Sequence, residues 1–241
     1  MNPFSLAGQT ALVTGANTGI GQAISVAMGR AGAHVICAGR SSCVETVAQI
    51  DSAATLTLDF ADPLAAKDVF AASKIDILVN NAGIIRRDDS VDFSEADWDD
   101  VMDVNMKAVF FTCQAFAKAA LPRGAGKIVN IASLLSFQGG IRVPSYTASK
   151  HGVAGLTKIM ANEWAAQGIN VNAIAPGYIE TNNTKALRAD VDRNKAILDR
   201  IPAGRWGKAD DIAETAVFLA SPAANYIHGT VLNVDGGWLA R

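Results

Sequence analysis

Tyr146 and Lys150 lie four residues apart and form the pair with the clearest chemical use in this sequence. On a helix, that spacing places both side chains on one face, one turn apart. A phenol titrates near pH ~10 and is a poor acid–base group at neutral pH, but a fixed cation beside it lowers that pKa. We therefore predict that Tyr146 exchanges a proton with an alcohol oxygen. An exposed amphipathic pair would have the same spacing, so other segments must decide between the two interpretations.

Ser133 directly follows the apolar run 128–132, which we predict to be a buried strand. Its hydroxyl is then expected at the carboxyl end of a strand, where open α/β sheets bind their ligands. Ser133 is therefore a second candidate for the same site, thirteen residues before Tyr146.

Apolar strands alternate with helical segments along the whole chain. Strands are predicted at residues 10–14, 34–38, 55–58, 75–79, 127–132, 169–174 and 231–234. The helices between them are predicted to run from the glycine-rich turn to about Ala31, from Val44 to Ile50, from Pro63 onward, from the N-cap Ser94 through Asn105 to about Ala120, and through Tyr146 to about Gln167. Because parallel strands need crossover helices, the alternation predicts one α/β domain over residues 1–241. Its architecture is a Rossmann-type, doubly wound, mostly parallel seven-stranded sheet with helices on both faces.

Composition argues against several classes of partner. The chain has 241 residues, of which 50% are hydrophobic and 18% charged, and its net charge is -2, so we expect no nucleic acid partner. No apolar run is long enough to span a membrane and the amino-terminal residues do not resemble a secretion signal, so we expect no membrane partner and a cytoplasmic location. Three cysteines without CxxC spacing and three scattered histidines predict no disulfide framework and no metal site.

A glycine-rich turn joins the first predicted strand to the first helix, with the spacing G-x-x-x-G-x-G at Gly15, Gly19 and Gly21. Glycines at such a turn let backbone N–H groups approach a pyrophosphate, whose charge is favoured at a helix N-terminus. The alternative is a turn that needs glycine only for packing of the helix on the sheet. The small residues 80–83 after the fourth strand likewise form either a polar turn or a surface against which a ligand lies.

Taken together, these motifs resemble the classical short-chain dehydrogenases/reductases. Residues 14–21, 80–83, Asn105, Ser133, the Tyr146/Lys150 pair and residues 176–177 occur in the order and spacing of that family. The resemblance extends from Leu6 to the C-terminus, and it implies a nicotinamide coenzyme, a small-molecule substrate and the interconversion of a secondary alcohol and a ketone.

The resemblance also implies a role for each residue of the site. Tyr146 would be the acid–base residue, Lys150 would lower its pKa and bind the nicotinamide ribose, and Ser133 would hold the substrate oxygen. Asn105 would complete a proton relay through water. The coenzyme would contact Tyr146, Lys150 and the residues Gly15, Asn17, Thr18, Gly19, Ile20, Gly21, Arg40, Asp59, Phe60, Asn81, Ala82, Gly83, Pro176, Gly177, Ile179 and Thr181.

The choice between NAD(H) and NADP(H) stays open at this point. An acidic residue at the end of the second strand would bind the adenosine ribose and repel a 2'-phosphate, but this chain has Gly39, Arg40 and Ser41 there. Arg40 is able to clamp a 2'-phosphate. The alternative is that Arg40 stacks on adenine or faces solvent.

Further runs resemble the members of the family that act on keto-deoxy sugar acids: residues 85–87, 93–102, 136–146, 181–184, 201–207 and 235–241. The carboxylate of such a substrate needs a cation, because burying it unpaired is costly. The candidate cations are Arg86, Arg87 and Arg142, unless they form structural ion pairs with Asp88, Asp89 or Asp92. The candidates for binding the substrate hydroxyls are Gln138, Asn182 and Asn183.

Other functions fit these residues less well. A methyltransferase could use a glycine-rich loop in a similar sheet, but Ser133, Tyr146 and Lys150 would then have no role. A binding module on this fold would be expected to lose part of the catalytic set. Within the enzymes, the alternatives are a 3-oxoacyl thioester reductase or a reductase of another sugar or polyol. The predicted helices at residues 108–120 and 152–164 are apolar on more than one face, which favours the homotetramer that the resemblance implies.

Overall fold

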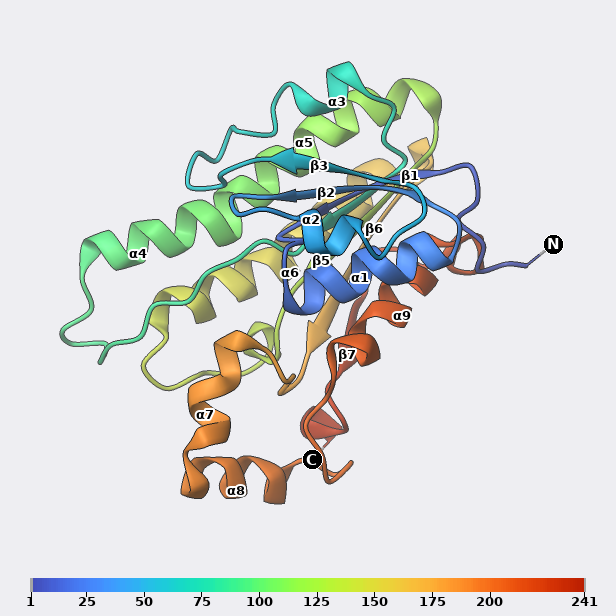
Figure 1. The fold of residues 1–241 in the computed structure, drawn as a ribbon. Coiled ribbons are helices and arrows are strands. Elements are labelled where there is room, and N and C mark those ends of the chain that lie inside the picture. Colours follow the sequence, from blue (N-terminus) through green and yellow to red (C-terminus); the bar gives the residue numbers. More distant parts are fainter. Residues whose placement is uncertain (1, 241) are drawn as a thin grey trace.

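The computed structural model describes residues 2–240 and contains a seven-stranded sheet of order β3-β2-β1-β4-β5-β6-β7, shown in Figure 1. Every neighbouring pair of strands is parallel, as the predicted Rossmann-type fold requires. The ends of the predicted domain, Met1 and Arg241, lie outside the described residues. The strands are β1 (Thr10–Thr14), β2 (His34–Gly39), β3 (Ala53–Thr57), β4 (Ile77–Asn80), β5 (Gly126–Ile131), β6 (Ile169–Pro176) and β7 (Val231–Val234).

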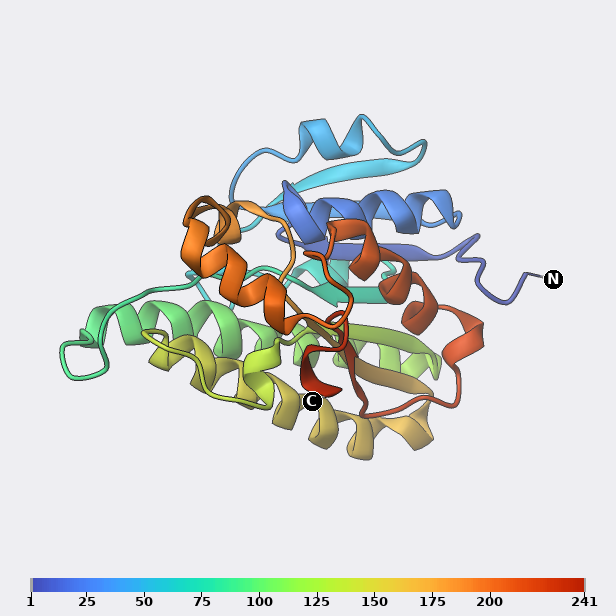
Figure 2. The same ribbon diagram turned by 90° about the horizontal axis from the view of Figure 1, so that it is seen from below.

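Helices cover both faces of the sheet (Figures 1 and 2). One face carries α1 (Gly19–Arg30), α2 (Val44–Val47) and α9 (Ala209–Ala220), and the other carries α3 (Val69–Ala72), α5 (Ala108–Ala120) and α6 (Pro144–Trp164). Three more helices lie outside these layers: α4 (Glu95–Met102) continues the line of α5, while α7 (Lys185–Ala189) and α8 (Val191–Arg200) stand off the sheet in Figure 1. No helix of residues 2–240 is long and apolar enough to cross a membrane.

Alternate residues of β1 enter two separate apolar cores. Ala11 and Val13 pack with Ile24 and Met28 of α1, whereas Leu12 packs on the opposite face with Phe116 of α5. All six of these side chains are fully buried. Because both faces are covered, the central strands must be apolar at every position, which is the pattern that identified them in the sequence.

Three predicted elements differ from the structure. Pro63 does not begin a helix: the carboxylates of Asp59 and Asp62 accept hydrogen bonds from the backbone N–H groups of Ala61 and Leu64, and these local turns compete with helix formation. The helix in that segment starts only at Val69. The third strand begins at Ala53, two residues before its predicted start at Thr55. The helix α2 ends at Val47 instead of the predicted Ile50.

The long helix predicted from Ser94 to Ala120 is interrupted in its middle. Its start is confirmed, because the Ser94 side chain accepts a hydrogen bond from the N–H of Asp97 at 3.1 Å. Between α4 and α5, however, residues Asp103–Lys107 form one π-helical turn. Such turns often occur at functional sites, and this one contains Asn105.

A chain of buried polar side chains joins the sheet to α6. The Asn80 amide donates to Oδ1 of Asn130 at 2.9 Å, and the Asn130 amide donates to Oγ1 of Thr157 at 3.0 Å. These residues belong to β4, β5 and α6 and are almost completely buried. Since a buried amide is costly to leave unpaired, the network fixes how α6 lies on β5.

We expect the replacement Phe116→Ala to lower the free energy of unfolding by roughly 3–5 kcal/mol, the usual range for truncating a buried phenylalanine. Phe116 is fully buried and its ring meets that of Phe70 edge-on, with centroids 5.7 Å apart. Urea denaturation of the two proteins at equal concentration measures the difference. The matched control is Phe4→Ala, because Phe4 also has an aromatic neighbour but is 48% exposed. Equal losses from both variants would contradict the assignment of Phe116 to the core.

Candidate active site

Tyr146 and Lys150 lie in the first two turns of α6, which confirms the predicted helical spacing. Pro144 occupies the first turn, where a missing backbone N–H costs nothing. The Lys150 ammonium lies 5.5 Å from the centre of the Tyr146 ring and donates to the carbonyl of Ile131 at 2.6 Å. The helix and the end of β5 thus place the two side chains side by side.

The protonation equilibria of this pair differ from the prediction. Burial lowers the pKa of Lys150 to about 8. Burial also raises the pKa of Tyr146, while a hydrogen bond with Ser133 and the positive charge of Arg87 act in the lowering direction. The role of Lys150 in lowering the Tyr146 pKa stays a prediction, because burial dominates the shift and Lys150 is not among its causes in this structure.

Ser133 lies two residues after the last residue of β5, in extended conformation, at the carboxyl end of the strand as predicted. Its Oγ accepts a hydrogen bond from the N–H of Leu135 at 3.2 Å and lies near enough to the Tyr146 phenol to act on its pKa as a hydrogen-bond partner. Ser136, which the sequence did not single out, donates from Oγ to the Lys150 carbonyl at 2.6 Å. This bond fastens the loop after β5 to α6, so the hydroxyls of Ser133 and Tyr146 stay together.

Asn105 joins the π-helical turn to the segment after Gly83. Its Oδ1 accepts from the N–H of Ile84 and its Nδ2 donates to the Ile84 carbonyl, both at 2.8 Å. A longer contact of 3.5 Å reaches Oγ of Ser149 on α6. Asn105 is fully buried and brings three separate segments together. Its part in a proton relay through water stays a prediction.

The glycine-rich turn combines both interpretations offered for it. A Cβ on Gly21 would lie only 2.1 Å from the Gly15 carbonyl oxygen, so Gly21 is required for packing. Gly19 has a φ of 57°, and a Cβ there would meet nothing closer than the Thr181 side chain at 3.6 Å. The N-cap residue of α1, Thr18, makes no side-chain cap, which leaves backbone N–H groups at this helix start for an anion. The turn therefore fits the pyrophosphate of a dinucleotide.

Thr14, the last residue of β1, holds this turn to the end of β4 and was not predicted as a site residue. Its Oγ1 accepts hydrogen bonds from the N–H groups of Asn81 and Ala82, each at 3.0 Å. In return, the Asn81 amide donates to the carbonyls of Thr14 and Gly15 at 3.0 and 3.1 Å. A polar residue closing an apolar strand was the signal in the sequence. Asn81 therefore supports the coenzyme loop through the backbone.

The residues predicted for the adenosine end occupy different environments. Arg40 lies just after β2 and is exposed, and none of the hydrogen bonds or ion pairs found in residues 2–240 involves it. Asp59 is exposed after β3, but Phe60 is buried in the core. Thr46, a residue that the sequence did not single out, is fully buried and donates to the Ala16 carbonyl at 2.8 Å. Arg40 is thus the side chain with the greatest freedom to reach a ligand here.

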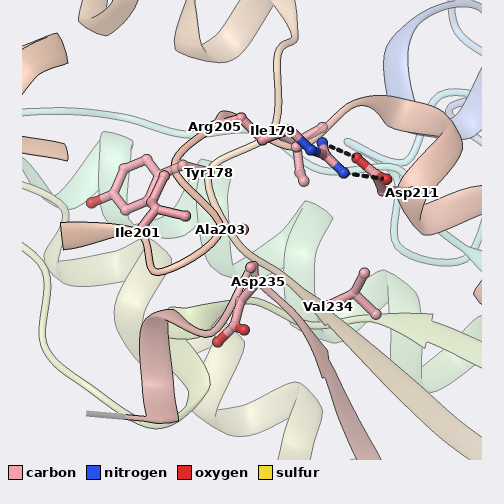
Figure 3. A pocket seen from close by; sticks show the side chains of 10 residues that line it. Tyr178, Ile179, Ile201, Ala203, Arg205, Asp211, Val234 and Asp235 are labelled. Carbon is pink, nitrogen blue, oxygen red and sulfur yellow. Dashed lines mark hydrogen bonds and ion pairs between the residues drawn. The ribbon is translucent and has the colours of Figure 1, made fainter. Parts of the chain in front are cut away.

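The segment after β6 carries the residues predicted for the nicotinamide end. Pro176 ends the strand, and the N–H of Gly177 donates to Val234 of β7 at 2.9 Å. Ile179 then pairs with Gly207 in an isolated β-bridge. Figure 3 shows the adjoining pocket, where the guanidinium of Arg205 makes two hydrogen bonds of 2.7 and 2.9 Å to the Asp211 carboxylate. This ion pair fixes the loop that contains Gly207. Because Gly207 pairs with Ile179, it also restrains the segment that leads to Thr181.

Two of the three candidate arginines are engaged in ion pairs. Arg86 contacts Asp97 at 3.1 Å and Asp100 at 3.0 Å, through Nε and Nη2. Arg142 contacts the carboxylates of the loop 88–89 at 3.5 and 3.0 Å. Both are therefore structural ion pairs, the alternative already weighed for them, although the partners of Arg86 are not the predicted aspartates.

Arg87 is the candidate arginine whose positive charge acts on the catalytic tyrosine. It makes one long hydrogen bond of 3.4 Å to the Asn183 carbonyl and lies near enough to Tyr146 to affect its pKa. Asn182 and Asn183 are exposed in a short turn before α7, as a polar rim requires. Gln138 already accepts a hydrogen bond from the Trp238 indole at 3.3 Å, so the C-terminal segment shares that side chain. No group of three or more metal-binding side chains lies within residues 2–240.

Comparison with known proteins extends over nearly the whole chain. A family model described as "Enoyl-(Acyl carrier protein) reductase" matches residues 15–239. The 2-dehydro-3-deoxy-D-gluconate 5-dehydrogenase of Bacillus subtilis (strain 168) is 57% identical over 247 residues, covering 99% of this chain and 97% of the relative. An Agrobacterium tumefaciens crystal structure with bound NADP, provisionally named 2-deoxy-D-gluconate 3-dehydrogenase, is 72% identical, covers 100% of both chains and has a TM-score of 0.99. A gluconate 5-dehydrogenase from Burkholderia cenocepacia J2315, crystallised with NADP and tartrate, is 38% identical, covers 100% of this chain and 98% of its own, and has a TM-score of 0.93.

We expect Tyr146→Phe to lower the turnover number with a nicotinamide coenzyme by ~100-fold to ~10,000-fold, because the variant keeps the ring but cannot exchange the proton. Coenzyme binding, measured by fluorescence titration, should stay close to that of the wild type. The matched control is Tyr226→Phe, since Tyr226 is 99% exposed and should tolerate the same change. Near-normal turnover by the Tyr146 variant would mean that the proton is transferred elsewhere.

Proposed function

The chain belongs to the short-chain dehydrogenase/reductase family, and we propose that within it the protein interconverts the alcohol and ketone forms of a keto-deoxy sugar acid such as 2-dehydro-3-deoxy-D-gluconate. Its reaction class is that of an NAD(P)-dependent oxidoreductase. The observation that supports the substrate proposal is the positive charge of Arg87, which acts on Tyr146 while Arg86 and Arg142 are held by aspartates. The names of the relatives support it independently.

Each catalytic side chain has a distinct part in this proposal. The Ser133 hydroxyl holds the substrate oxygen that Tyr146 protonates or deprotonates, because Ser133 lies near enough to the phenol to act on its pKa. Lys150 orients the coenzyme ribose and keeps a positive charge beside the phenol. The coenzyme supplies the hydride chemistry, while the protein supplies position and electrostatics. Asn105 maintains the segment after Gly83 in place and is the proposed start of the proton relay.

The substrate carboxylate is proposed to pair with Arg87. A carboxylate that leaves water needs a hydrogen-bonded cation, and a guanidinium can bind it through two parallel N–H groups. Arg86 and Arg142 would first have to give up their existing partners, which makes them weaker candidates. Asn182 and Asn183 lie on the same side of the site as Arg87, through the contact with the Asn183 carbonyl, and are proposed to bind hydroxyl groups.

We expect Arg87→Gln to raise KM for 2-dehydro-3-deoxy-D-gluconate by roughly 10-fold to 100-fold, the loss of one hydrogen-bonded charge pair. KM for an uncharged ketone should change little. The matched controls Arg86→Gln and Arg142→Gln should raise KM by less than about 5-fold, because exposed ion pairs contribute only ~0–1 kcal/mol.

Two results would contradict the substrate proposal. One is an equal change in KM for charged and neutral substrates in all three arginine variants. The other is a wild-type preference for a 3-oxoacyl thioester, the alternative substrate class within this family. In either case turnover of nicotinamide coenzyme by the wild type would still support the reaction class.

The coenzyme is NAD(H) or NADP(H), and Arg40 provides the test. If its guanidinium holds a 2'-phosphate, Arg40→Ala should weaken NADP binding by roughly 1.5–3 kcal/mol and leave NAD binding nearly unchanged. Calorimetric titration with both coenzymes measures the two effects. Arg30→Ala is a matched control, because Arg30 is exposed at the other end of α1 and pairs with Glu214. An equal loss for NAD and NADP would instead indicate stacking of Arg40 on adenine.

The assembly is proposed to be a homotetramer of single-domain subunits. On α6, Ile159 is 48% exposed and a Cβ on Gly155 would meet no atom within 4 Å, so this face is open to another subunit. Leu232 on the edge strand β7 is 36% exposed. A cytoplasmic location is part of the same proposal, because the coenzyme and the sugar acid are small charged metabolites. Light scattering that gave a monomer mass would contradict the assembly.

A further inference from the structure

A second groove lies at the amino ends of the strands, whereas the active site lies at their carboxyl ends. It has a volume of about 570 Å³ and is lined in part by Lys74, Asp76, Lys127, Asn170, Asn225 and His228. Asp76 directly precedes β4, while Lys127 and Asn170 are the second residues of β5 and β6. The groove therefore lies at the amino ends of these strands. Ser133 follows the carboxyl end of β5. No step of the proposed reaction uses the groove.

Lys127 is the central polar residue of this groove. Its Nζ donates to Oδ1 of Asn170 at 2.9 Å and to Oδ1 of Asn225 at 2.7 Å. The Asn170 amide is held in that orientation, because its Nδ2 donates to the carbonyls of Asn225 and Ile227, each at 3.0 Å. Both acceptors of Lys127 are thus neutral oxygens. Among residues 2–240, no carboxylate lies within ion-pair distance of its ammonium.

The other charged and titratable groups around the groove do not neutralise Lys127. Asp76 pairs with Lys74 at 3.4 Å and also accepts the N–H of Thr10 at 3.1 Å. His228 contacts the Asn170 amide at 3.2 Å through Nε2. Burial without a counter-charge lowers the pKa of Lys127 to about 8. Lys127 is therefore mostly charged at pH 7, but a larger fraction of it is the neutral amine than for an ordinary lysine.

Among residues 2–240, Lys127 has two hydrogen-bond acceptors, which leaves one position on its nitrogen without a protein acceptor. A neutral amine has two N–H donors, and the oxygens of Asn170 and Asn225 satisfy both. Its lone pair then takes the third position, away from the two amide oxygens. We propose that Lys127 is a site of covalent acylation by small acyl phosphates that enter this groove. The amine nitrogen attacks the acyl carbon, the new C–N bond replaces the C–O bond to phosphate, inorganic phosphate leaves, and the amine proton passes to water.

Acylation has a structural consequence distant from the catalytic residues. The amide that forms has one N–H donor, so one of the two amide oxygens loses its hydrogen bond and the positive charge is removed. Asn225 belongs to the segment that leads into β7, which Lys127 and Asn170 together hold against the sheet. Modified protein should therefore have a lower Tm, whereas the turnover number of the folded enzyme should be unchanged.

The test is the rate of acetylation of each lysine when the full-length protein is incubated with acetyl phosphate. Digestion with a glutamate-specific protease and mass spectrometry measure the modified fraction with time at pH 6.5, 7.5 and 8.5. Lys74 is the control for delivery of the reagent, because it lines the same groove but pairs with Asp76. Lys67, an exposed lysine in a turn, is the control for simple accessibility. We expect Lys127 to react at least ~10-fold faster than either at pH 7.5, with a rate that rises toward pH 8.5.

Asn225→Asp supplies a matched variant outside the catalytic and coenzyme machinery. The side chain keeps its size but places a carboxylate beside the Lys127 ammonium, which favours the charged amine. Acetylation of Lys127 should fall at least ~10-fold while the rates at Lys67 and the turnover number stay unchanged. A wild-type Lys127 that reacts no faster than Lys74 and Lys67 would overturn the proposal. So would an unchanged Lys127 rate in a variant that retains wild-type turnover.

Discussion

The hydrogen bond from the Asn130 amide to Thr157 is the contact on which the geometry of the active site depends. It lies inside the core, where an unpaired amide would cost roughly 1–3 kcal/mol, so α6 has one favoured position on β5. Ser133 follows that strand and Tyr146 lies in the first turn of that helix, so the distance between their hydroxyls is set by this position. Lys150 adds a second link, since its ammonium binds the last carbonyl of β5.

The same principle operates at the coenzyme loop. Thr14 and Asn81 exchange hydrogen bonds between the ends of β1 and β4, the two strands at which the direction of winding reverses. A doubly wound sheet opens a crevice at that place, and ligands bind there because the loops diverge to opposite faces. In this protein the crevice is stabilised by side chains that need not touch the ligand, which leaves the backbone of the glycine-rich turn free to do so.

Charge is distributed differently at the two edges of the sheet. Near the carboxyl ends of the strands, aspartates hold Arg86 and Arg142, whereas the charge of Arg87 acts on Tyr146. Near the amino ends, the hydrogen-bond acceptors that Lys127 finds within residues 2–240 are neutral oxygens. Neither Arg87 nor Lys127 has a carboxylate partner within residues 2–240. As a result, Arg87 can bind an anion and Lys127 can lose its proton.

The sequence by itself determined the strands, the parallel sheet and the positions of Ser133, Tyr146 and Lys150, because apolar runs and helical spacing depend on residues close together in the chain. It could not determine the turns around Pro63 or the π-helical turn at Asn105, where side-chain hydrogen bonds and packing override the local pattern. Nor could it determine which arginine is free or in which direction the pKa of Tyr146 moves. Those properties were decided by the tertiary structure, since Arg86 meets Asp100 and Lys127 meets Asn225 only after segments distant in the sequence pack together. The energy of a charge depends on such neighbours and on its burial, and neither can be predicted from the residues nearby in the sequence.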